Sequence, residues 1–404
     1  MRIGIVANEP SGDQLGAILI RALRDLRPDL DFVGVAGPRM AAAGCASLID
    51  QERLAVMGLV AVLRHLPEIL RLRRQLGDYF LTHRPDLFVG VDAPDFNLAL
   101  ERRLRQAGIP TAHLVSPTVW AWRPGRVKGL RAAVDLVLSI FPFEEAYLRE
   151  RGVPARYIGH PLADEIPLET DPRAARQALG LPLTGPVIAL LPGSRVSEVK
   201  LLARPFLETV RWCLERDPAL SFVVPLVSPR LRALFEEVRA GVAPALPLTL
   251  VDGHGREAMT AADAVLSASG TATLEALLLK RPLVVGYRVD GLTYRLVKAL
   301  NLIKVPHVAM ANLLAGEELA PEFLQDRCRP DLMGPALLAF LTDPGRVARI
   351  QATYDRIHRQ LRQDAGPRAA RALLELVAGL GVGLEGEAGP KPAGPARHSP
   401  EKGP

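Results

Sequence analysis

The sequence predicts an α/β protein made of two Rossmann-like, doubly wound domains that face each other across a cleft. The chain has 404 residues, which is more than one ordinary core accommodates and enough for two. Short runs rich in Val and Ile alternate with longer amphipathic segments, and this alternation is typical of repeated β-α-β units. The pattern restarts after a stretch that carries several Pro and Asp residues, 159–186, so we expect the second domain to begin there.

The expected strands are short runs that are apolar throughout. Such runs favour a parallel sheet whose two faces are both covered by helices. In the first half of the chain they lie at 3–7, 32–35, 87–91, 112–115 and 136–140. In the second half they lie at 187–191, 222–225, 248–251, 264–267 and 283–287.

This pattern divides the chain into four parts. The two domains are expected at 1–163 and 164–344. The segment 345–380 is expected to be helical, to close the chain and to be able to pack back on the first domain. The tail at 385–404 is rich in Pro and Gly and lacks apolar periodicity, which predicts disorder.

The composition limits the classes of function. With 49% apolar and 23% charged residues, the chain is expected to be folded and globular. Its net charge of +6 suits an anionic partner, whether nucleic acid, a membrane surface or a phosphorylated small molecule. The cysteines are far apart, which argues for free thiols in a reducing compartment and against a disulfide framework or a zinc site. The first apolar run is expected to be a buried strand, not a signal peptide, and no apolar run is long enough to span a bilayer.

An acidic motif, V-D-A-P-D-F-N, follows the expected strand at 87–91. Asp92 lies at the carboxyl end of that strand, where open α/β sheets bind their ligands, so it is our candidate general base. Asp95 is the competing candidate, although it can also serve only to cap the following helix. No His or further acid lies at metal-ligand spacing, so no metal is predicted.

A second motif, E-P-S-G-D, follows the first expected strand. Ser11, Gly12 and Asp13 lie where a helix should begin, and the free N–H groups of a helix start favour anions. The stretch is not a G-x-G-x-x-G sequence, which disfavours a dinucleotide site. A helix cap without any ligand is the alternative.

The first strand of the second half ends in L-P-G-S-R. Gly193 permits close approach of a backbone, Ser194 offers a hydroxyl, and Arg195 offers a forked cation that suits phosphate. A diphosphate held in this way needs no metal. The alternative is a turn with an exposed arginine.

A run of small residues ends a later strand, in S-G-T-A-T-L-E. Ser269, Gly270 and Thr271 would let a ligand touch the backbone at a helix start, and Glu275 could accept hydrogen bonds from ribose hydroxyls. Asn312 belongs to a loop that could close on the nucleotide. A capped helix and a plain connecting loop are the alternatives.

Two stretches of the first domain suit a membrane surface. The nearly apolar run 54–63, which contains Met57, is far too short to span a bilayer, but it could enter one leaflet with the following arginines on headgroups. Trp120 and Trp122 stand beside Arg123, a combination that suits a membrane interface, a phosphorylated amphiphile or single-stranded nucleic acid. An ordinary core helix and a packed loop are the alternatives.

The order of these motifs resembles the lipid-A-disaccharide synthase family, glycosyltransferases of the GT-B fold. The resemblance covers 2–378 and also includes G-V-A-G-P-R-M, F-P-F-E, I-G-H-P, G-R-E-A-M and V-V-G-Y-R. The chain departs from the family at Asn8 and Pro10, where Gly and Ala or Thr are usual.

The resemblance implies an inverting transfer of 2,3-diacylglucosamine from UDP-2,3-diacylglucosamine to the 6-hydroxyl of 2,3-diacylglucosamine 1-phosphate. The products are UDP and the β-1,6-linked lipid A disaccharide 1-phosphate, an intermediate of lipopolysaccharide biosynthesis. The first domain would hold the acceptor and the second the UDP-sugar. The resemblance implies no cofactor, no metal and no nucleic-acid partner. It also implies a cytoplasmic protein attached peripherally to the cytoplasmic face of the inner membrane, and it is compatible with a homodimer.

The resemblance also distributes roles among the candidate residues. It makes Asp92 the catalytic acid/base. The UDP side comprises Gly193, Ser194, Arg195, Ser269, Gly270, Thr271, Glu275 and Asn312. The acceptor and membrane side comprises Ser11, Gly12, Asp13, Met57, Trp120, Trp122 and Arg123.

Two rival functions use the same residues differently. Other GT-B enzymes, such as a UDP-N-acetylglucosamine 2-epimerase or a peptidoglycan glycosyltransferase, share the fold but not this ordered series of motifs. An RNA-binding protein on a Rossmann scaffold would leave Asp92 and Arg195 without a role. Such a protein should ignore UDP and bind RNA with a steep dependence on salt.

Overall fold

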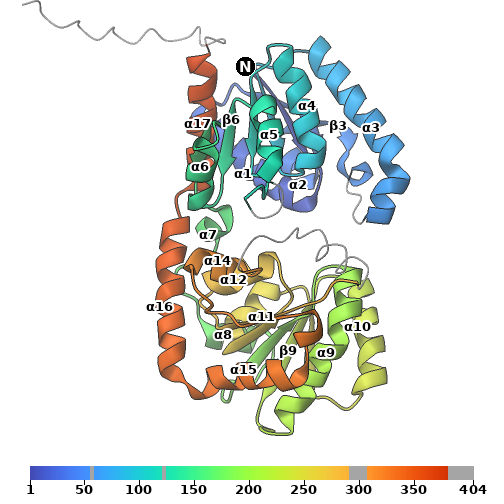
Figure 1. Ribbon diagram of the computed structural model, residues 1–404, viewed down its shortest axis with the longest axis vertical. Coiled ribbons are helices and arrows are strands. Elements are labelled where there is room, and N and C mark those ends of the chain that lie inside the picture. The colour runs from blue at the N-terminus through green and yellow to red at the C-terminus, as the bar shows by residue number, and fades with distance from the viewer. Residues whose placement is uncertain (55–58, 121–123, 291–306, 381–404) are drawn as a thin grey trace, which may run out of the picture.

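The computed structural model describes residues 1–54, 59–120, 124–290 and 307–380. Its described part forms two α/β lobes, one above the other along the long axis of the molecule (Figure 1). This confirms the predicted fold class. The tail predicted to be disordered lies outside the described residues, as do Met57, Trp122 and Arg123.

The first lobe is built on a parallel sheet of seven strands. They are β1 (Arg2–Ala7), β2 (Asp31–Ala36), β3 (Cys45–Asp50), β4 (Leu87–Val91), β5 (Thr111–Leu114), β6 (Leu136–Ser139) and β7 (Ala155–Tyr157). Their order in the sheet is β3-β2-β1-β4-β5-β6-β7, and each neighbouring pair is parallel. All five strands expected in this half are present, and the two edge strands, β3 and β7, are additional.

Helices cover both faces of this sheet. In this part of the chain they are α1 (Pro10–Leu26), α2 (Pro38–Ala42), α3 (Leu59–Thr82), α4 (Pro94–Gln106), α5 (Val127–Ala133) and α6 (Pro142–Arg149). Ile3 and Ile5 of β1 point to the face covered by α1 and by the last helix, α17 (Ala365–Gly379), whereas Val6 points to the face covered by α3 and α4. Because both faces are buried, the central strands are apolar throughout, as the sequence pattern predicted.

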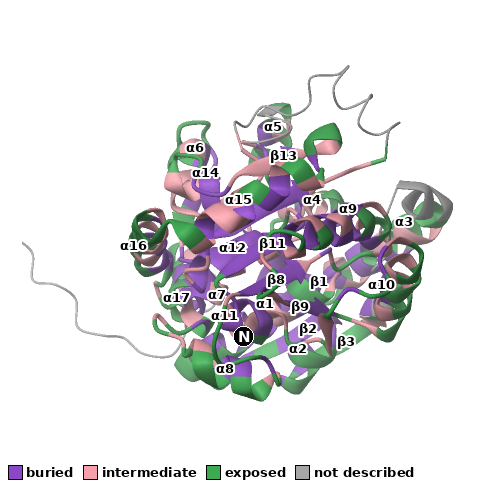
Figure 2. Cartoon of the chain, turned by 90° about the horizontal axis from the view of Figure 1, so that it is seen from below, coloured by how far each residue is buried: buried purple, intermediate pink, exposed green. Residues whose placement is uncertain are grey.

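The second lobe is built on a parallel sheet of six strands. They are β8 (Val187–Leu191), β9 (Ser221–Leu226), β10 (Leu248–Asp252), β11 (Ala264–Ser267), β12 (Leu283–Tyr287) and β13 (Glu322–Leu324), in the order β10-β9-β8-β11-β12-β13. The helices described around it are α8 (Pro172–Ala178), α9 (Val196–Leu214), α10 (Pro229–Val242), α11 (Gly255–Ala261), α12 (Thr271–Leu278), α14 (Met310–Ala315) and α15 (Pro330–Thr342). Seen along the long axis, buried residues gather on strands and on inner helix faces, and exposed ones lie on the outer helices (Figure 2).

The chain crosses between the lobes twice, and the two crossings are tied together. The first crossing contains α7 (Pro161–Glu165), and the second runs from α16 (Pro344–Leu361), beside the second lobe, to α17, beside the first (Figure 1). The carboxylate of Asp164 accepts hydrogen bonds from the backbone N–H groups of residues 363–365, where α17 begins. The closing segment is therefore two helices, one packed on each lobe.

Candidate active site between the two sheets

The loops that carry the candidate residues follow the two points where strand order reverses. In the first sheet β1 and β4 are neighbours, and Glu9 and Asp92 follow them. In the second sheet β8 and β11 are neighbours, followed by 193–195 and 269–271. The carboxyl ends of strands at such a switch point form the crevice in which open α/β sheets bind ligands. Each lobe therefore offers one ligand crevice.

Asp92 lies in a backbone turn that few residues adopt. Asp92 and Ala93 have φ values of 51° and 43°, the left-handed region that disfavours side chains with a Cβ. The buried side-chain amide of Asn97 donates to the Asp92 carbonyl at 2.8 Å and to the Val91 carbonyl at 3.3 Å, and so holds the turn. Strain of this kind is concentrated at functional sites. The turn leaves the Asp92 side chain in a cavity between α3 and α4.

Asp95, the competing candidate, is placed differently. Its side chain is 83% exposed, and Oδ1 lies 2.8 Å from Nη1 of Arg126, an ion pair on the surface. It also borders the cavity that contains Asp92, but its carboxylate is already neutralised by a cation. This arrangement favours Asp92 as the base, and the assignment stays a prediction.

Glu9 lines the cavity around Asp92, and no role for it was predicted from the sequence. It is half-buried between the lobes, and burial raises the pKa of its carboxyl, as does the nearby charge of Asp92. Arg195 of the second lobe acts in the opposite direction and lowers this pKa. The carboxyl of Glu9 is therefore influenced by the charge of Asp92, the candidate base in the first lobe, and by that of Arg195, the candidate phosphate-binding residue in the second. Its position directly after the first strand was the available signal.

The cavity around Asp92 is lined by both acidic and apolar side chains. It has a volume of about 390 Å³. Its lining residues are Asn8, Glu9, Leu54, Leu66, Ile69, Leu70, Arg73, Asp92, Ala93, Pro94, Asp95 and Phe96. The leucines and isoleucine of α3 line the cavity together with three carboxylates, so it suits a ligand that has both polar and apolar parts.

The second lobe carries a smaller cavity of about 270 Å³ at its switch point. Predicted residues line it together: Gly193, Ser194, Arg195, Ser269, Gly270, Thr271 and Glu275. Gly193 has φ 122°, and a Cβ there would come within 2.4 Å of the Cβ of Glu198, so this position requires glycine. The Glu198 carboxylate accepts hydrogen bonds from the N–H groups of Ser194 (2.9 Å) and Arg195 (3.2 Å) and fixes the loop.

Glu275 is held by a chain of polar contacts that links the two lobes. Arg256 of α11 donates from Nε to Glu275 at 2.9 Å and from Nη2 to Glu165 at 3.2 Å. Glu165 in turn accepts a hydrogen bond of 2.8 Å from Gln14 of α1. Arg256 was not recognised as a site residue from the sequence, although it belongs to the quoted G-R-E-A-M motif. It orients the carboxylate that we expect to bind ribose.

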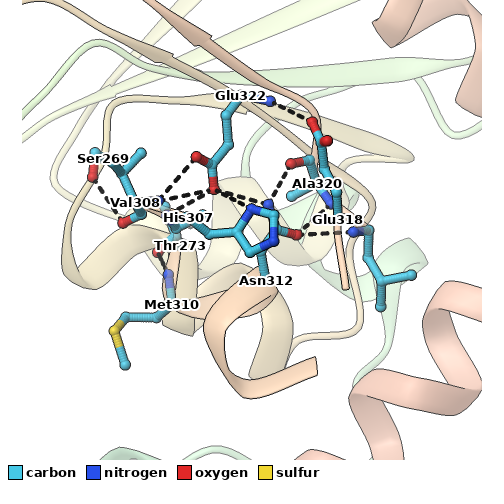
Figure 3. A network of polar contacts seen from close by, with 11 residues as sticks. Ser269, Thr273, His307, Val308, Met310, Asn312, Glu318, Ala320 and Glu322 are labelled. Atoms are coloured by element: carbon cyan, nitrogen blue, oxygen red, sulfur yellow. Dashed lines mark hydrogen bonds and ion pairs between the residues drawn. The ribbon is translucent and has the colours of Figure 1, made fainter. Parts of the chain in front are cut away.

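Asn312 lies beside this cavity but does not line it. Its amide donates to the Ala320 carbonyl at 2.7 Å and to Glu322 at 2.8 Å, and its oxygen accepts from the N–H groups of Leu319 and Ala320 (Figure 3). Since the side chain is fully buried and both of its ends are bonded, a direct contact with UDP would require these bonds to open. In this structure Asn312 supports the loop, and its contact with UDP stays a prediction.

The same network joins the Asn312 loop to the small-residue turn. Ser269 donates to the Val308 carbonyl at 3.3 Å, and the N–H of Met310 donates to Thr273 at 3.2 Å (Figure 3). Glu322 accepts from the N–H groups of Val308 and Ala309, each at 2.9 Å. The loop is therefore positioned by the residues that begin α12.

The S-G-D residues after β1 are used in part for structure. The buried carboxylate of Asp13 accepts hydrogen bonds of 2.9 Å from the N–H groups of Arg39 and Met40, at the start of α2. This is a capping role, although for a neighbouring helix and not for its own. Ser11 is exposed and borders an open hollow of about 850 Å³ above β1–β3, whereas Gly12 is buried. Ser11 is thus the accessible side chain of the three.

Trp120 is anchored by a buried carboxyl group. Its indole Nε1 donates to Glu144 at 3.1 Å, and the N–H of Phe141 donates to the same carboxyl at 3.1 Å. The ring also meets Phe143 edge to face. Burial raises the pKa of Glu144 to about 8, and hydrogen bonds from Trp120 and from the backbone of Ile140 and Phe141 oppose this rise. The polar edge of Trp120 is therefore engaged within the protein.

We expect Glu144 to make stability depend on pH. The folded protein holds this proton more tightly than the unfolded chain, so the stability of the wild type should fall as pH rises from about 4.5 to about 8. Glu144→Gln removes this titration. The Tm of the variant minus that of the wild type should therefore increase between pH 5 and pH 8. Glu150→Gln, exposed at the end of the same helix, should show no such trend; a constant difference for both variants would contradict the assignment.

The described part of the chain contains no preformed metal-binding cluster, and its cysteine thiols are buried. Within it, no group of three or more His, Cys, Asp or Glu side chains is arranged to hold a metal ion. The three cysteines are free and buried, and burial raises the pKa of each thiol. No helix among the described residues is long and apolar enough to cross a bilayer.

Comparison with known proteins identifies the family. The family model described as lipid-A-disaccharide synthetase matches residues 3–377. The chain belongs to the lipid-A-disaccharide synthase family. Members of the family are UDP-sugar glycosyltransferases that make the lipid A disaccharide of lipopolysaccharide. The family predicted from the order of the sequence motifs is therefore confirmed.

Individual lipid-A-disaccharide synthases match nearly from end to end. The chain is 52% identical to the enzyme of Pseudomonas paraeruginosa strain PA7, over 93% of the chain and 98% of the relative. It is 48% identical to the enzyme of Methylobacillus flagellatus, over 93% of the chain and 99% of the relative.

Solved structures with the same fold are more distant. A UDP-GlcNAc 2-epimerase from Neisseria meningitidis bound to UDP-GlcNAc matches with a TM-score of 0.60 and 13% identity, over 94% of this chain and 100% of that one. The glycotransferase of kitacinnamycin matches with a TM-score of 0.59 and 17% identity, over 93% of this chain and 98% of that one. At these identities the likeness shows the fold alone, so it does not favour the epimerase alternative.

Proposed function

We propose that the chain performs the family's reaction with Asp92 as the general base and with UDP leaving toward Arg195. The donor is UDP-2,3-diacylglucosamine and the acceptor is 2,3-diacylglucosamine 1-phosphate. The observation that carries this proposal is the placement of Asp92 in the cavity at the switch point of the first sheet and of Arg195 in the cavity at the switch point of the second. A sugar bound between the lobes would have a base on one side and a cation on the other.

The reaction follows from this arrangement. The acceptor's 6-hydroxyl gives its proton to the Asp92 carboxylate as its oxygen attacks the anomeric carbon of the donor. The bond between that carbon and the UDP oxygen breaks, and UDP takes the electron pair. Attack from the face opposite UDP inverts the anomeric centre and gives a β linkage. The Arg195 guanidinium and the N–H groups at the starts of α9 and α12 stabilise the negative charge that develops on UDP.

UDP binding is the simplest experiment that separates an enzyme of this kind from an RNA-binding protein. Calorimetric titration should show saturable binding of UDP at a single site. Titration with RNA should show no binding beyond weak, salt-sensitive association. Absence of UDP binding combined with tight RNA binding would overturn the proposal.

We further propose that α3 contacts the cytoplasmic face of the inner membrane. Leu66 and Leu70 are 40% and 43% exposed on α3 and also border the cavity that contains Asp92, and Arg71, which follows Leu70, is exposed. Apolar side chains beside a cation suit a surface of anionic lipid. In the run 54–63, where we first expected this contact, Leu54 is buried, and nothing is described of the side chains at 55–63.

Homodimerisation stays a prediction. Light scattering of the purified chain would measure its oligomeric state.

The double variant Leu66→Ser/Leu70→Ser tests this contact. Full burial of one leucine side chain is worth roughly 1.5–3 kcal/mol, so losing two partly inserted ones should weaken association with anionic liposomes at least about tenfold. UDP affinity should not change. Leu26→Ser removes a leucine of equal exposure, 43%, from the end of α1 and serves as the matched control. Equal liposome binding by the double variant and the wild type would exclude α3 as the contact.

A further inference from the structure

One cation stands among the described side chains that border the cavity around Asp92. Three carboxylates border this cavity, those of Glu9, Asp92 and Asp95, and the positive charge is that of Arg73 on α3. An anionic ligand that enters such a cavity is repelled by the carboxylates and is attracted to the place of the guanidinium. The position of Arg73 therefore decides where the negative end of a ligand can lie.

Arg73 is not neutralised by a carboxylate within the described residues. Its Nη1 donates a long hydrogen bond of 3.4 Å to the backbone carbonyl of Asp95. Two arginines of the surrounding elements are paired with carboxylates: Arg103 with Asp78 at 2.6 Å, and Arg126 with Asp95 at 2.8 Å. A half-buried guanidinium without a carboxylate partner retains its fork of N–H donors for a ligand, and that fork matches the oxygens of phosphate.

The helix presents this cation together with an apolar stripe. Leu66, Ile69, Leu70 and Arg73 occupy positions i, i+3, i+4 and i+7, which lie on one face of a helix, and all four border the cavity. A ligand along this face would meet apolar side chains first and a cation one turn later. That order suits an acylated sugar with a phosphate at its polar end.

We propose that Arg73 binds the 1-phosphate of the acceptor and thereby orients the sugar ring. The phosphate is on C1 and the reacting hydroxyl is on C6, so the two groups project from opposite ends of the glucosamine unit. With the phosphate held at Arg73, the 6-hydroxyl at the other end of the sugar is directed to Asp92 and the acyl chains lie along the apolar stripe. This inference rests on the proposed reaction and adds a site that distinguishes a phosphorylated acceptor from an unphosphorylated one.

The test compares two acceptors and two variants. The acceptors are 2,3-diacylglucosamine 1-phosphate and the same sugar without phosphate, presented in neutral detergent micelles that contain no anionic lipid. The variants are Arg73→Gln and Arg74→Gln; Arg74 is the exposed neighbour, which does not border the cavity. Both variants lose one positive charge from the same turn of α3, so a general effect of surface charge would affect both equally.

We expect Arg73→Gln to raise KM and to lower kcat/KM for the phosphorylated acceptor on the order of 10- to 100-fold, as loss of a charged hydrogen-bonding pair does. With the unphosphorylated acceptor, wild type and variant should agree within about twofold. UDP affinity and Tm should stay unchanged, Arg73→Lys should recover part of the loss, and Arg74→Gln should match the wild type. Equilibrium binding of the two acceptors should show the same pattern, with the preference for phosphate lost in Arg73→Gln.

Several results would overturn this inference. One is an equal loss by Arg73→Gln on both acceptors, and another is a wild-type enzyme that binds both acceptors equally well. If Arg73→Gln and Arg74→Gln both weaken binding to anionic vesicles and neither alters the preference between acceptors, the guanidinium serves lipid headgroups instead. A wild-type chain that transfers sugar to neither acceptor would contradict the proposed reaction itself, which is a different failure.

Discussion

Asp92→Asn is expected to lower kcat by about two orders of magnitude or more while UDP affinity stays nearly unchanged. An amide of the same size cannot take the proton of the acceptor hydroxyl, so the transition state loses its base but the site keeps its shape. The turn should survive, because Asn97 holds it through backbone carbonyls and not through the Asp92 side chain. Steady-state assays with both substrates, together with UDP titration, measure the two quantities separately.

Asp95→Asn is the matched control for this experiment. It removes a carboxylate three residues away that is exposed and paired with Arg126, so its effect on kcat should be small. We also expect Asp92→Asn to lower the pKa of Glu9, because the Asp92 charge contributes to raising it. If Asp95→Asn costs more activity than Asp92→Asn does, the base is Asp95.

Arg195→Ala is expected to weaken UDP binding about tenfold or more and to lower kcat/KM by a further factor, on the order of 10²–10³ in total. Its side chain is exposed at the mouth of the nucleotide cavity, where it can meet a diphosphate. Arg195→Lys should recover only part of the activity, since an ammonium group lacks the planar fork of donors. UDP titration and steady-state kinetics of both variants provide the measurement.

Arg204→Ala is the control, because it removes an exposed arginine from the same helix that follows Arg195 but lies away from the cavity. It should behave as the wild type does. Activity of the wild type should persist in EDTA, since we propose that Arg195 and backbone N–H groups neutralise the diphosphate without a metal. Unchanged affinity and rate in Arg195→Ala would remove this residue from the site, and a strict need for a divalent ion would contradict the proposal.

The sequence predicted the central strands and failed to predict three edge strands. The central ones are apolar throughout because both of their faces are covered, and this pattern is visible in any such run. The edge strand β3 (Cys45–Asp50) has mostly exposed side chains, whereas β7 and β13 have three residues each, too few for a periodic pattern. Their pairing depends on the neighbouring strand, which a local pattern does not reveal.

The candidate site was predictable where a residue directly follows a strand. The positions of Asp92 and Arg195 at the two cavities could be predicted in this way, because the topology brings the strand ends of each sheet to the crevice of that lobe. Arg73 and Arg256 could not, because one lies within a helix and the other depends on a partner, Glu275, that is distant in sequence. Asn312 shows the opposite case. As a polar residue in a loop it was predicted to bind a ligand, but its side chain is hydrogen-bonded within the protein, to Ala320 and Leu319.

Transfer of sugar between the two defined substrates is the decisive measurement of this activity. The purified chain would be incubated with UDP-2,3-diacylglucosamine and 2,3-diacylglucosamine 1-phosphate, without added metal, and the products would be quantified and examined by NMR. We expect UDP and a β-1,6-linked disaccharide 1-phosphate in equal amounts. Release of UDP without disaccharide, or formation of an α-linked product, would contradict it.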